Sequence, residues 1–240
     1  MPDPAVLLIR PKAQAERFAA RIGRALPQAR IVISPLMEIR PVMPDTPLRG
    51  AAGLVFTSEN AVAAVEGHDG LHDLPVWCVG ERTAAAARRA GFVRVASAAS
   101  DGGDAEGLLR MLLRQRPAGP LLHLRGTHAA GDLARRLTDA GVPCLPVVVY
   151  DQPSRPLNRA ALGLLAGADP VLLPLFSPRS ARLFLDAAAS IDAPLHPVAI
   201  SPAAAAVWRA ARADPLCIAA RPDAEAMVES LVAAWHRIVA

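Results

Sequence analysis

The sequence predicts an α/β protein built from two similar domains, each with a parallel sheet. Short β-rich runs alternate with Ala-, Leu- and Arg-rich helical stretches, which is typical of parallel α/β domains. A series of motifs also occurs twice along the chain, which indicates an internal duplication. The 240 residues are 52% hydrophobic and 20% charged, enough for two ordinary domains with a substantial core. This balance excludes a disordered tail and a coiled coil.

The first predicted strand is the apolar run at 5–9, and an amphipathic helix with Phe18 and Ile22 on one face follows it. The second predicted strand is at 29–34. Further strands are predicted at 54–57, 76–79, 92–96, 121–124, 147–150, 171–173, 198–200 and 217–219. Alternation of these strands with helices favours parallel β-α-β units over hairpins.

The internal repeat is carried by matching motifs that recur in the same order at a nearly constant spacing. The pairs are LLIRP at 7–11 with LHLRG at 122–126, VFTSENAV at 55–62 with LFSPRSA at 175–181, VWCVGERTA at 76–84 with VAISPAAAA at 198–206, and DAEGLL at 104–109 with DAEAMV at 223–228. Conserved order over the whole chain is hard to obtain by chance, so we interpret it as a duplicated α/β unit.

Two domain organisations fit this repeat. A cut near Gly119 would put one repeat in each domain. Alternatively, the first β-α-β segment of each repeat could join the remainder of the other. Proline flanks the stretches 35–41 (PLMEIRP) and 146–153 (PVVVYDQP), which predicts extended structure outside the main sheets. These two stretches could pair as crossing strands between the domains.

The charge is dispersed and comes almost entirely from arginine. The net charge is +4, and Lys12 is the only lysine among 26 basic residues. Arginine binds carboxylates and phosphates through a planar fork, which suits recognition of anions. No basic run is present and aromatic content is 4%, so we expect no nucleic-acid partner.

Three cysteines, Cys78, Cys144 and Cys217, lie in apolar, strand-like contexts that predict buried free thiols. Their odd number, without paired spacing, argues against a disulfide framework or a zinc site. The apolar run at 5–9 is too short for a signal peptide or a membrane span, so we expect a cytoplasmic protein without a membrane partner.

Candidate site residues follow the predicted strands, because parallel α/β sheets bind ligands outside the carboxyl ends of their strands. The candidates with hydroxyl or amide side chains are Thr57, Ser58, Asn60, Thr83, Ser177 and Ser201. Helix N-termini at these points favour carboxylate or phosphate, although such residues also serve as ordinary helix caps. Arg10 and Arg125 close the first strand of each repeat and are candidates for gripping an anion.

Common cofactor and metal motifs are absent from the sequence. No Gly-x-Gly-x-x-Gly supports a dinucleotide site. His68 and His72 have helical ligand spacing, but the glycines between and before them favour a surface loop. Tyr150, the single tyrosine, lies in the VVVYDQP stretch.

Taken together, the motifs resemble those of the uroporphyrinogen-III synthase family of tetrapyrrole biosynthesis. The resemblance rests on LLIRP, FTSENAV, VGERTA, LLHLRG, VVVYDQP, LFSPRSARLF and AISPAAAAVWRAA, which span essentially the whole chain in the expected order. It implies two α/β domains with a cleft between them, joined by a two-stranded linker. The implied domains are 1–35 with 153–240, and 42–145, with 36–41 and 146–152 as linker strands.

The resemblance also implies the reaction. The substrate would be hydroxymethylbilane, a linear tetrapyrrole with eight carboxylates, which the enzyme closes while inverting the last pyrrole ring. This cyclising lyase needs no metal or organic cofactor. A monomer is the family expectation, and hydroxymethylbilane synthase, which supplies the unstable substrate, is a candidate for transient contact.

Matching by motif assigns roles to several residues. Tyr150 matches the connector tyrosine of the family, the best candidate for assisting departure of the substrate hydroxyl. Thr83 matches the threonine after the Val-Gly strand end, and Ser58 and Ser177 match the hydroxyls that open the two repeated helices. Ala204 stands where the family usually has threonine, so that hydroxyl is not required here.

A second hypothesis comes from another class of protein: a non-catalytic, two-lobed binding or regulatory protein for an anionic small molecule. It would keep the cleft, and Ala204 would be an early sign of lost catalysis. A duplicated signalling receiver ranks last, because the chain lacks the acidic cluster and strand-end lysine of such domains.

Overall fold

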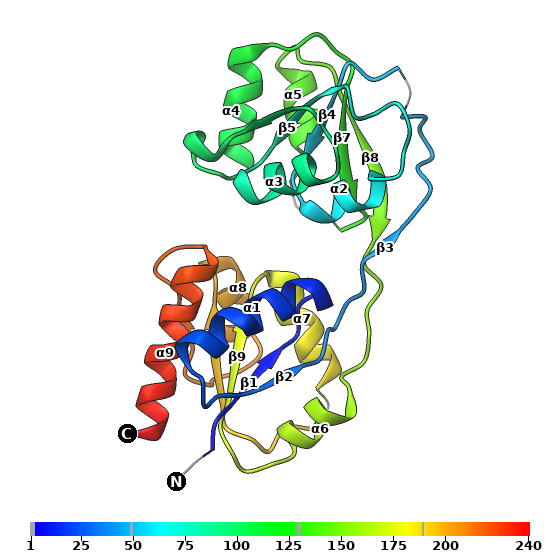
Figure 1. Cartoon of the computed structure of the whole chain (residues 1–240). Coiled ribbons are helices and arrows are strands. Elements are labelled where there is room, and N and C mark those ends of the chain that lie inside the picture. The colour runs from blue at the N-terminus through cyan, green and yellow to red at the C-terminus, as the bar shows by residue number, and fades with distance from the viewer. Residues whose placement is uncertain (1–2, 49, 129–130, 189) are drawn as a thin grey trace. The chain divides into compact units, whose positions relative to one another are not determined.

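The computed structural model describes residues 3–48, 50–128, 131–188 and 190–240 (Figure 1). The chain divides into two compact units. The first unit contains Met1–Glu38 together with Pro153–Ala240, and the second contains Ile39–Gln152. The first unit is therefore discontinuous in sequence, and the second is one uninterrupted segment.

The first unit is a five-stranded parallel sheet in the order β11-β10-β9-β1-β2. Its strands are β1 (Ala5–Leu8), β2 (Arg30–Ile33), β9 (Val171–Leu175), β10 (Leu195–Ala199) and β11 (Cys217–Ile218). Its helices are α1 (Lys12–Ala25), α6 (Arg159–Leu165), α7 (Pro178–Ala187), α8 (Pro202–Arg209) and α9 (Ala224–Val239).

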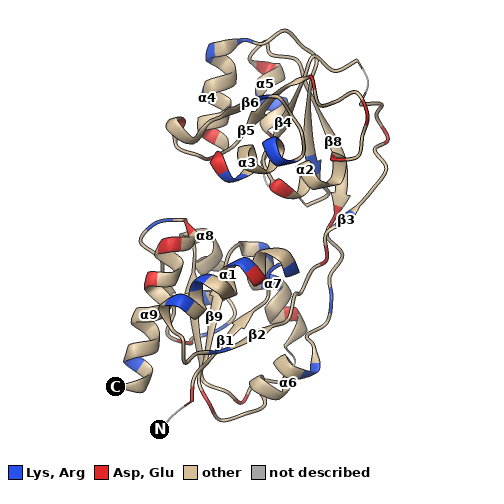
Figure 2. Cartoon of the chain, in the orientation of Figure 1, with Lys and Arg blue, Asp and Glu red and all other residues tan. Residues whose placement is uncertain are grey.

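Helices cover both faces of this sheet. Leu7 in β1 packs into one core with residues of α6, α7 and α8, whereas Leu8 packs into another with residues of α1 and α9. Alternate residues of a strand point to opposite faces, so a strand buried on both sides must be apolar throughout. All four residues of β1 are buried, which explains its uninterrupted apolar run. Figure 2 shows the charged residues of this unit mainly on helices and loops.

The second unit is a six-stranded sheet in the order β3-β8-β7-β4-β5-β6. Its strands are β3 (Arg40–Pro41), β4 (Gly53–Phe56), β5 (Pro75–Cys78), β6 (Arg94–Ser97), β7 (Leu121–Gly126) and β8 (Cys144–Asp151). All neighbouring pairs are parallel except β3 with β8, which is antiparallel. The α-helices are α2 (Glu59–Val65), α3 (Glu81–Arg89), α4 (Ala105–Gln115) and α5 (Leu133–Asp139), and a short 3₁₀ helix spans Ala99–Asp101.

The sequence-predicted strands all occur, with their ends shifted by a few residues. The prediction that Pro146–Pro153 lies outside the main sheets, as a linker strand at 146–152, was wrong for most of that stretch. β8 runs from Cys144 to Asp151 as a full member of the second sheet, parallel to β7. Buried Val147 and Val149 hold it there, packed in the same core as residues of α2 and α3.

Antiparallel backbone pairing occurs where the chain passes from one unit to the other. Met37 pairs with Ser154, and the Glu38 N–H donates to the carbonyl of Pro153 at 3.1 Å. In the second unit, Arg40 and Pro41 of β3 pair with Asp151 and Tyr150 of β8.

The buried-thiol prediction holds for two of the three cysteines. Cys78 and Cys144 are buried, and burial raises the pKa of the Cys78 thiol to about 12 and that of Cys144 to about 11. Cys217 is only half-buried, because β11 is a two-residue strand at the edge of its sheet. None of the helices in the described ranges is long and apolar enough to cross a membrane.

The packing of β4 against β5 generates a stability prediction. A Cβ added at Gly53 would lie 2.5 Å from the Trp77 ring and 2.8 Å from the Pro75 carbonyl oxygen. We expect Gly53→Ala to lower the free energy of unfolding by about 1–3 kcal/mol, as overpacking typically does. Gly67→Ala is the matched control, because its Cβ would meet nothing within 4 Å. Urea denaturation of both variants checks this; equal stability would contradict it.

Candidate functional site

In the second unit, most of the predicted site residues lie at the carboxyl ends of four adjacent strands. Tyr150 is near the end of β8, and Arg125 is near the end of β7. Thr57 follows β4, and Thr83 lies in the first turn of α3, which follows β5. Because β8, β7, β4 and β5 are neighbours and parallel, their carboxyl ends share one edge of the sheet.

Tyr150 is held tightly against the β7 backbone. Its side chain is 5% exposed and packs in the core with residues of α2 and α3. A Cβ at Gly126 would lie 2.5 Å from the Tyr150 ring, so only glycine allows the ring to lie there. The Thr127 N–H donates to the Tyr150 carbonyl at 3.1 Å. Among the described residues, none hydrogen-bonds the Tyr150 hydroxyl, which leaves that group available to a ligand.

Thr57 pairs with a histidine that the sequence reasoning missed. Thr57 Oγ1 lies 3.1 Å from His123 Nε2. His123 is 3% exposed, and its Nδ1 has no hydrogen-bond partner in the described part of the chain. Burial, with a smaller effect of the Arg125 charge, lowers the pKa of His123 from 6.5 to about 4. The imidazole is therefore neutral at pH 7. The sequence feature that could have pointed to His123 is its position as a polar residue inside the apolar strand LLHLRG.

The other hydroxyl and amide candidates of this unit lie at helix N-termini, whereas Arg125 is in β7. Ser58 caps α2, and its hydroxyl oxygen accepts a hydrogen bond from the Asn60 backbone N–H at 3.2 Å. Thr83 is 4% exposed in the first turn of α3, whose N-cap is Gly80. Arg125 Nε donates to the Gly126 carbonyl at 3.3 Å.

The first unit carries the other candidates at an equivalent edge. Arg10 follows β1, Ser177 follows β9 and Ser201 follows β10, three adjacent parallel strands. The Arg10 guanidinium lies over the Phe176 ring at 3.8 Å from its centroid and donates to Gln14 at 3.2 Å. This stacking holds the guanidinium at the strand ends.

Both serines of this edge are helix caps. Ser177 forms a capping box with Ser180, each side chain accepting from the other residue's backbone N–H. Ser201 accepts from the Ala204 N–H at 3.3 Å. Ala204 itself is fully buried in the first turn of α8, packed with Ala199. At Ser201, capping uses the hydroxyl oxygen as an acceptor and leaves its hydrogen able to bond a ligand, whereas the Ser177 hydroxyl also donates to Ser180 Oγ at 3.1 Å.

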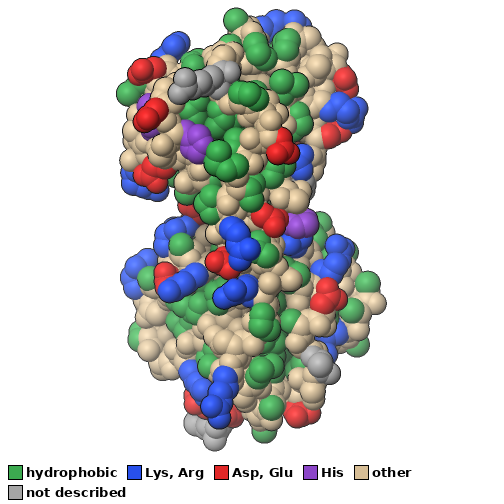
Figure 3. All heavy atoms as spheres, turned by 90° about the vertical axis from the view of Figure 1, so that its right-hand side faces the viewer, with side chains coloured by type: hydrophobic (Ala, Val, Ile, Leu, Met, Phe, Trp, Pro, Cys, Tyr) green, Lys and Arg blue, Asp and Glu red, His purple; other side chains and the backbone are tan. Residues whose placement is uncertain are grey.

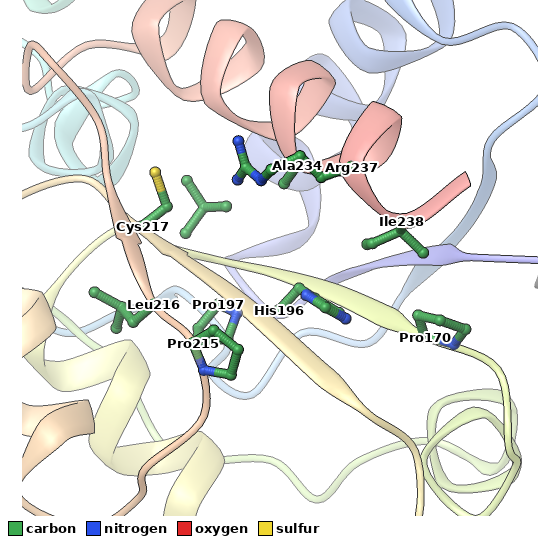
Figure 4. Close-up of a pocket in the computed structure, with 10 residues that line it drawn as sticks. Pro170, His196, Pro197, Pro215, Leu216, Cys217, Ala234, Arg237 and Ile238 are labelled. Carbon is green, nitrogen blue, oxygen red and sulfur yellow. The ribbon is translucent and has the colours of Figure 1, made fainter. Parts of the chain in front are cut away.

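A cavity of about 610 Å³ lies elsewhere in the first unit (Figure 4). Arg237 reaches it from α9 and His196 from β10, among apolar residues that include Pro170 and Pro215. Pro170 precedes β9 and Pro215 precedes β11, so the cavity is at the amino ends of these strands. No predicted site residue is among the described residues that line it. Burial, then nearby Arg237, lowers the pKa of His196.

The described ranges bring no three His, Cys, Asp or Glu side chains together as metal ligands would require. On the face shown in Figure 3, positive and negative side chains alternate with hydrophobic ones. The polar groups described above at the strand ends are hydroxyls, arginines and helix N-termini. This set of groups suits the binding of carboxylates.

These features define an α/β protein whose candidate ligand-binding groups lie at the carboxyl ends of parallel strands in each unit. The family model described as uroporphyrinogen-III synthase HemD matches residues 16–229. The chain therefore belongs to the uroporphyrinogen-III synthase family, a family of lyases in tetrapyrrole biosynthesis. None of the curated proteins compared with the chain matches it.

Solved structures support the fold. A uroporphyrinogen-III synthetase from Helicobacter pylori has a TM-score of 0.71 and 18% identity, covering 96% of this chain and 99% of that one. A mutant uroporphyrinogen III synthase from the extremely thermophilic bacterium Thermus thermophilus has a TM-score of 0.54 and 14% identity, covering 97% and 99%. At these identities the likeness concerns the mixed α/β fold.

The low pKa of His123 predicts a pH-dependent stability. Between pH 6.5 and about 4 the unfolded chain binds a proton that the folded imidazole does not. The contribution of neutral His123 to the free energy of unfolding is fully present above pH 6.5 and is lost as the pH falls. We expect the free energy of unfolding to decrease by up to about 1.4 kcal/mol per pH unit between pH 6.5 and about 4.

Chemical denaturation at intervals from pH 8 to 4 measures this dependence. His123→Leu is expected to show a shallower decline than the wild type, because only His196 and carboxyl groups with lowered pKa values then contribute to the slope. His68→Leu, a half-buried loop position, controls for loss of a histidine. Identical slopes for the wild type and His123→Leu would show that His123 does not titrate as inferred.

Proposed function

We propose that this chain converts hydroxymethylbilane to uroporphyrinogen III, closing the macrocycle with inversion of the last pyrrole ring. The observation that carries the proposal is the family match over residues 16–229. The strand-end hydroxyls and arginines of both units support it, since the substrate is a flexible polyanion. Family membership favours this function over the non-catalytic binding protein that the sequence left open.

Each unit carries groups suited to binding carboxylates of the substrate. Ser58 and Asn60 begin α2, and Ser177 and Ser201 begin α7 and α8, where free N–H groups and the helix dipole favour anions. The arginines near these ends, Arg10 and Arg125, add fixed positive charge. Several weak contacts on one linear molecule restrict its conformations, and positioning supplies most of the catalysis.

Tyr150 acts as the general acid in this proposal. Its phenol protonates the hydroxyl on the hydroxymethyl group of the first ring. The C–O bond breaks, water departs, and the first ring becomes an azafulvene cation. The last ring attacks the carbon that lost the hydroxyl, through its own substituted position, and forms a spiro intermediate. In the spiro intermediate the bond from the last ring to its original methylene bridge breaks, and that bridge then bonds the free α-carbon of the same ring, which inverts the ring. The proton lost from this α-carbon returns to the tyrosinate. Thr83 stays a predicted catalytic residue, buried in the first turn of α3.

We also propose that the two units arose from a duplication with exchanged segments. Strand β1, helix α1 and strand β2 lie in the first unit, whereas the matching β7, α5 and β8 lie in the second. Corresponding final helices begin at the matched residues Asp104 and Asp223, and each carboxylate accepts from a backbone N–H three residues on. Each unit then combines segments of both repeats.

The setting of the reaction follows from its chemistry. We propose a cytoplasmic monomer that uses no cofactor, since loss of water and carbon–carbon bond formation involve no oxidation or reduction. The unstable bilane is received from hydroxymethylbilane synthase through transient contact.

The direct test is a coupled assay. Hydroxymethylbilane is generated in situ, the protein is added, and the products are oxidised and separated by chromatography. Predominant type III isomer, increasing with protein concentration, is the expected result. Type I isomer alone from a folded sample would refute the proposal.

Removing the Tyr150 hydroxyl tests the proposed acid. We expect Tyr150→Phe to lower kcat about 10²-fold, a typical effect of losing a general acid. Because no described residue hydrogen-bonds that hydroxyl, the variant is expected to fold with nearly wild-type stability. Steady-state rates of type III isomer formation and a thermal unfolding curve give the two measurements. A kcat within twofold of wild type would remove Tyr150 from the mechanism.

Gly126 offers an independent test of the Tyr150 position. A Cβ at Gly126 would meet the Tyr150 ring at 2.5 Å and its hydroxyl oxygen at 2.9 Å. Gly126→Ala is therefore expected to displace the ring and to lower kcat at least tenfold, because small misplacements of a catalytic group are costly. The same change in the Tyr150→Phe background is expected to lower kcat little further. Full additivity would contradict an effect through Tyr150.

A further inference from the structure

The contact between Thr57 and His123 follows from the strand register. Val55 in β4 is paired with His123 in β7. Thr57 comes two residues after Val55, so its side chain points to the same face of the sheet as Val55 and His123. The two polar side chains meet there, with Oγ1 and Nε2 3.1 Å apart. His123 is buried, whereas Thr57 is half-buried at the carboxyl end of β4.

The unpartnered ring nitrogen decides which tautomer fits this site. A hydrogen on Nδ1 would be a buried donor with no acceptor among the described residues. A hydrogen on Nε2 instead donates to Thr57 Oγ1 and leaves Nδ1 as a buried acceptor. Orphaned buried N–H groups are rarer than under-satisfied acceptors. The geometry therefore favours the tautomer that is protonated at Nε2.

This tautomer fixes what the threonine hydroxyl can do. Thr57 Oγ1 accepts from His123, so its own hydrogen is not used in that bond. The Thr57 side chain has no other hydrogen bond in the part of the chain that the structure describes. Its hydrogen is thus available at the strand end, next to Ser58 and the beginning of α2. A hydroxyl in this state is a donor suited to a carboxylate.

We propose that His123 is a positioning residue, which holds the Thr57 hydroxyl as an outward donor to a carboxylate of the substrate. The inference rests on the proposed function, because that function supplies the carboxylate ligand. His123 does not touch the substrate in this arrangement. It fixes the direction of the Thr57 hydrogen bond, so its loss weakens binding more than it slows the chemical steps.

Substrate-binding kinetics test the role of His123. We expect Thr57→Val and His123→Leu each to raise KM about tenfold, the scale of a hydrogen bond to a charged group, with kcat within twofold of wild type. The double variant is expected to be no worse than either single variant. His123→Gln, whose side-chain amide can donate to Thr57, is expected to keep KM near wild type. His68→Leu, in the loop between α2 and β5, is the matched control.

Three outcomes would overturn the proposal. The first is an unchanged KM in His123→Leu, whatever its thermal stability, while Thr57→Val raises KM. The second is an equal increase in KM for His123→Leu and His123→Gln. The third is a KM in the double variant that is raised by the product of the two single effects. A wild-type protein that yields only type I isomer would instead overturn the proposed function.

A spectroscopic measurement on the wild-type protein does not depend on turnover. A long-range ¹H–¹⁵N correlation spectrum at pH 7 distinguishes protonated from unprotonated histidine ring nitrogens. The His123 signals are assigned as those missing from the spectrum of His123→Gln. We expect the proton on Nε2. A proton on Nδ1 would overturn the proposal, because Thr57 would then donate inward.

Discussion

Parallel pairing between strands that lie far apart in the sequence is the constraint on which both units depend. β1 joins β9 through the pairs Ala5–Val171 and Val6–Leu172. In the second unit, β4 joins β7 in the same way. Parallel strands need long connections, and those connections form the helices that bury both sheet faces. Within each sheet the same pairing turns the carboxyl ends of the parallel strands to one edge, which in the first unit gathers Arg10 and Ser177 from separate segments.

Several of the side chains proposed to bind the ligand are also helix caps at the strand ends of their own unit. Ser58, Ser177 and Ser201 each accept a backbone hydrogen bond, which fixes the hydroxyl oxygen. A fixed hydroxyl loses little conformational freedom when a ligand binds, so capping would prepare these serines for the proposed binding role. Tyr150 also combines two roles, because its packing against Gly126 in the core orients its phenol.

The sequence predicted the strands well, because buried parallel strands are continuous apolar runs bounded by polar or glycine residues. It misplaced the stretch at 146–152, because the flanking prolines suggested an isolated segment, while burial of Val147 and Val149 keeps β8 in the sheet. Strand-end hydroxyls could be predicted from their position alone. The bond between Thr57 and His123 could not, since it depends on the register of two strands more than 60 residues apart in the chain.

The interrupted first unit also affects the order in which the protein can fold during synthesis. Ile39–Gln152 contains every strand of its own sheet and can complete its core while the following residues are still being made. β1 and β2 are made well before β9, the second neighbour of β1, which is complete only when Val171–Leu175 has left the ribosome. One side of the apolar strand Ala5–Leu8 therefore lacks its strand partner through most of translation, when exposed strand edges are most prone to aggregate.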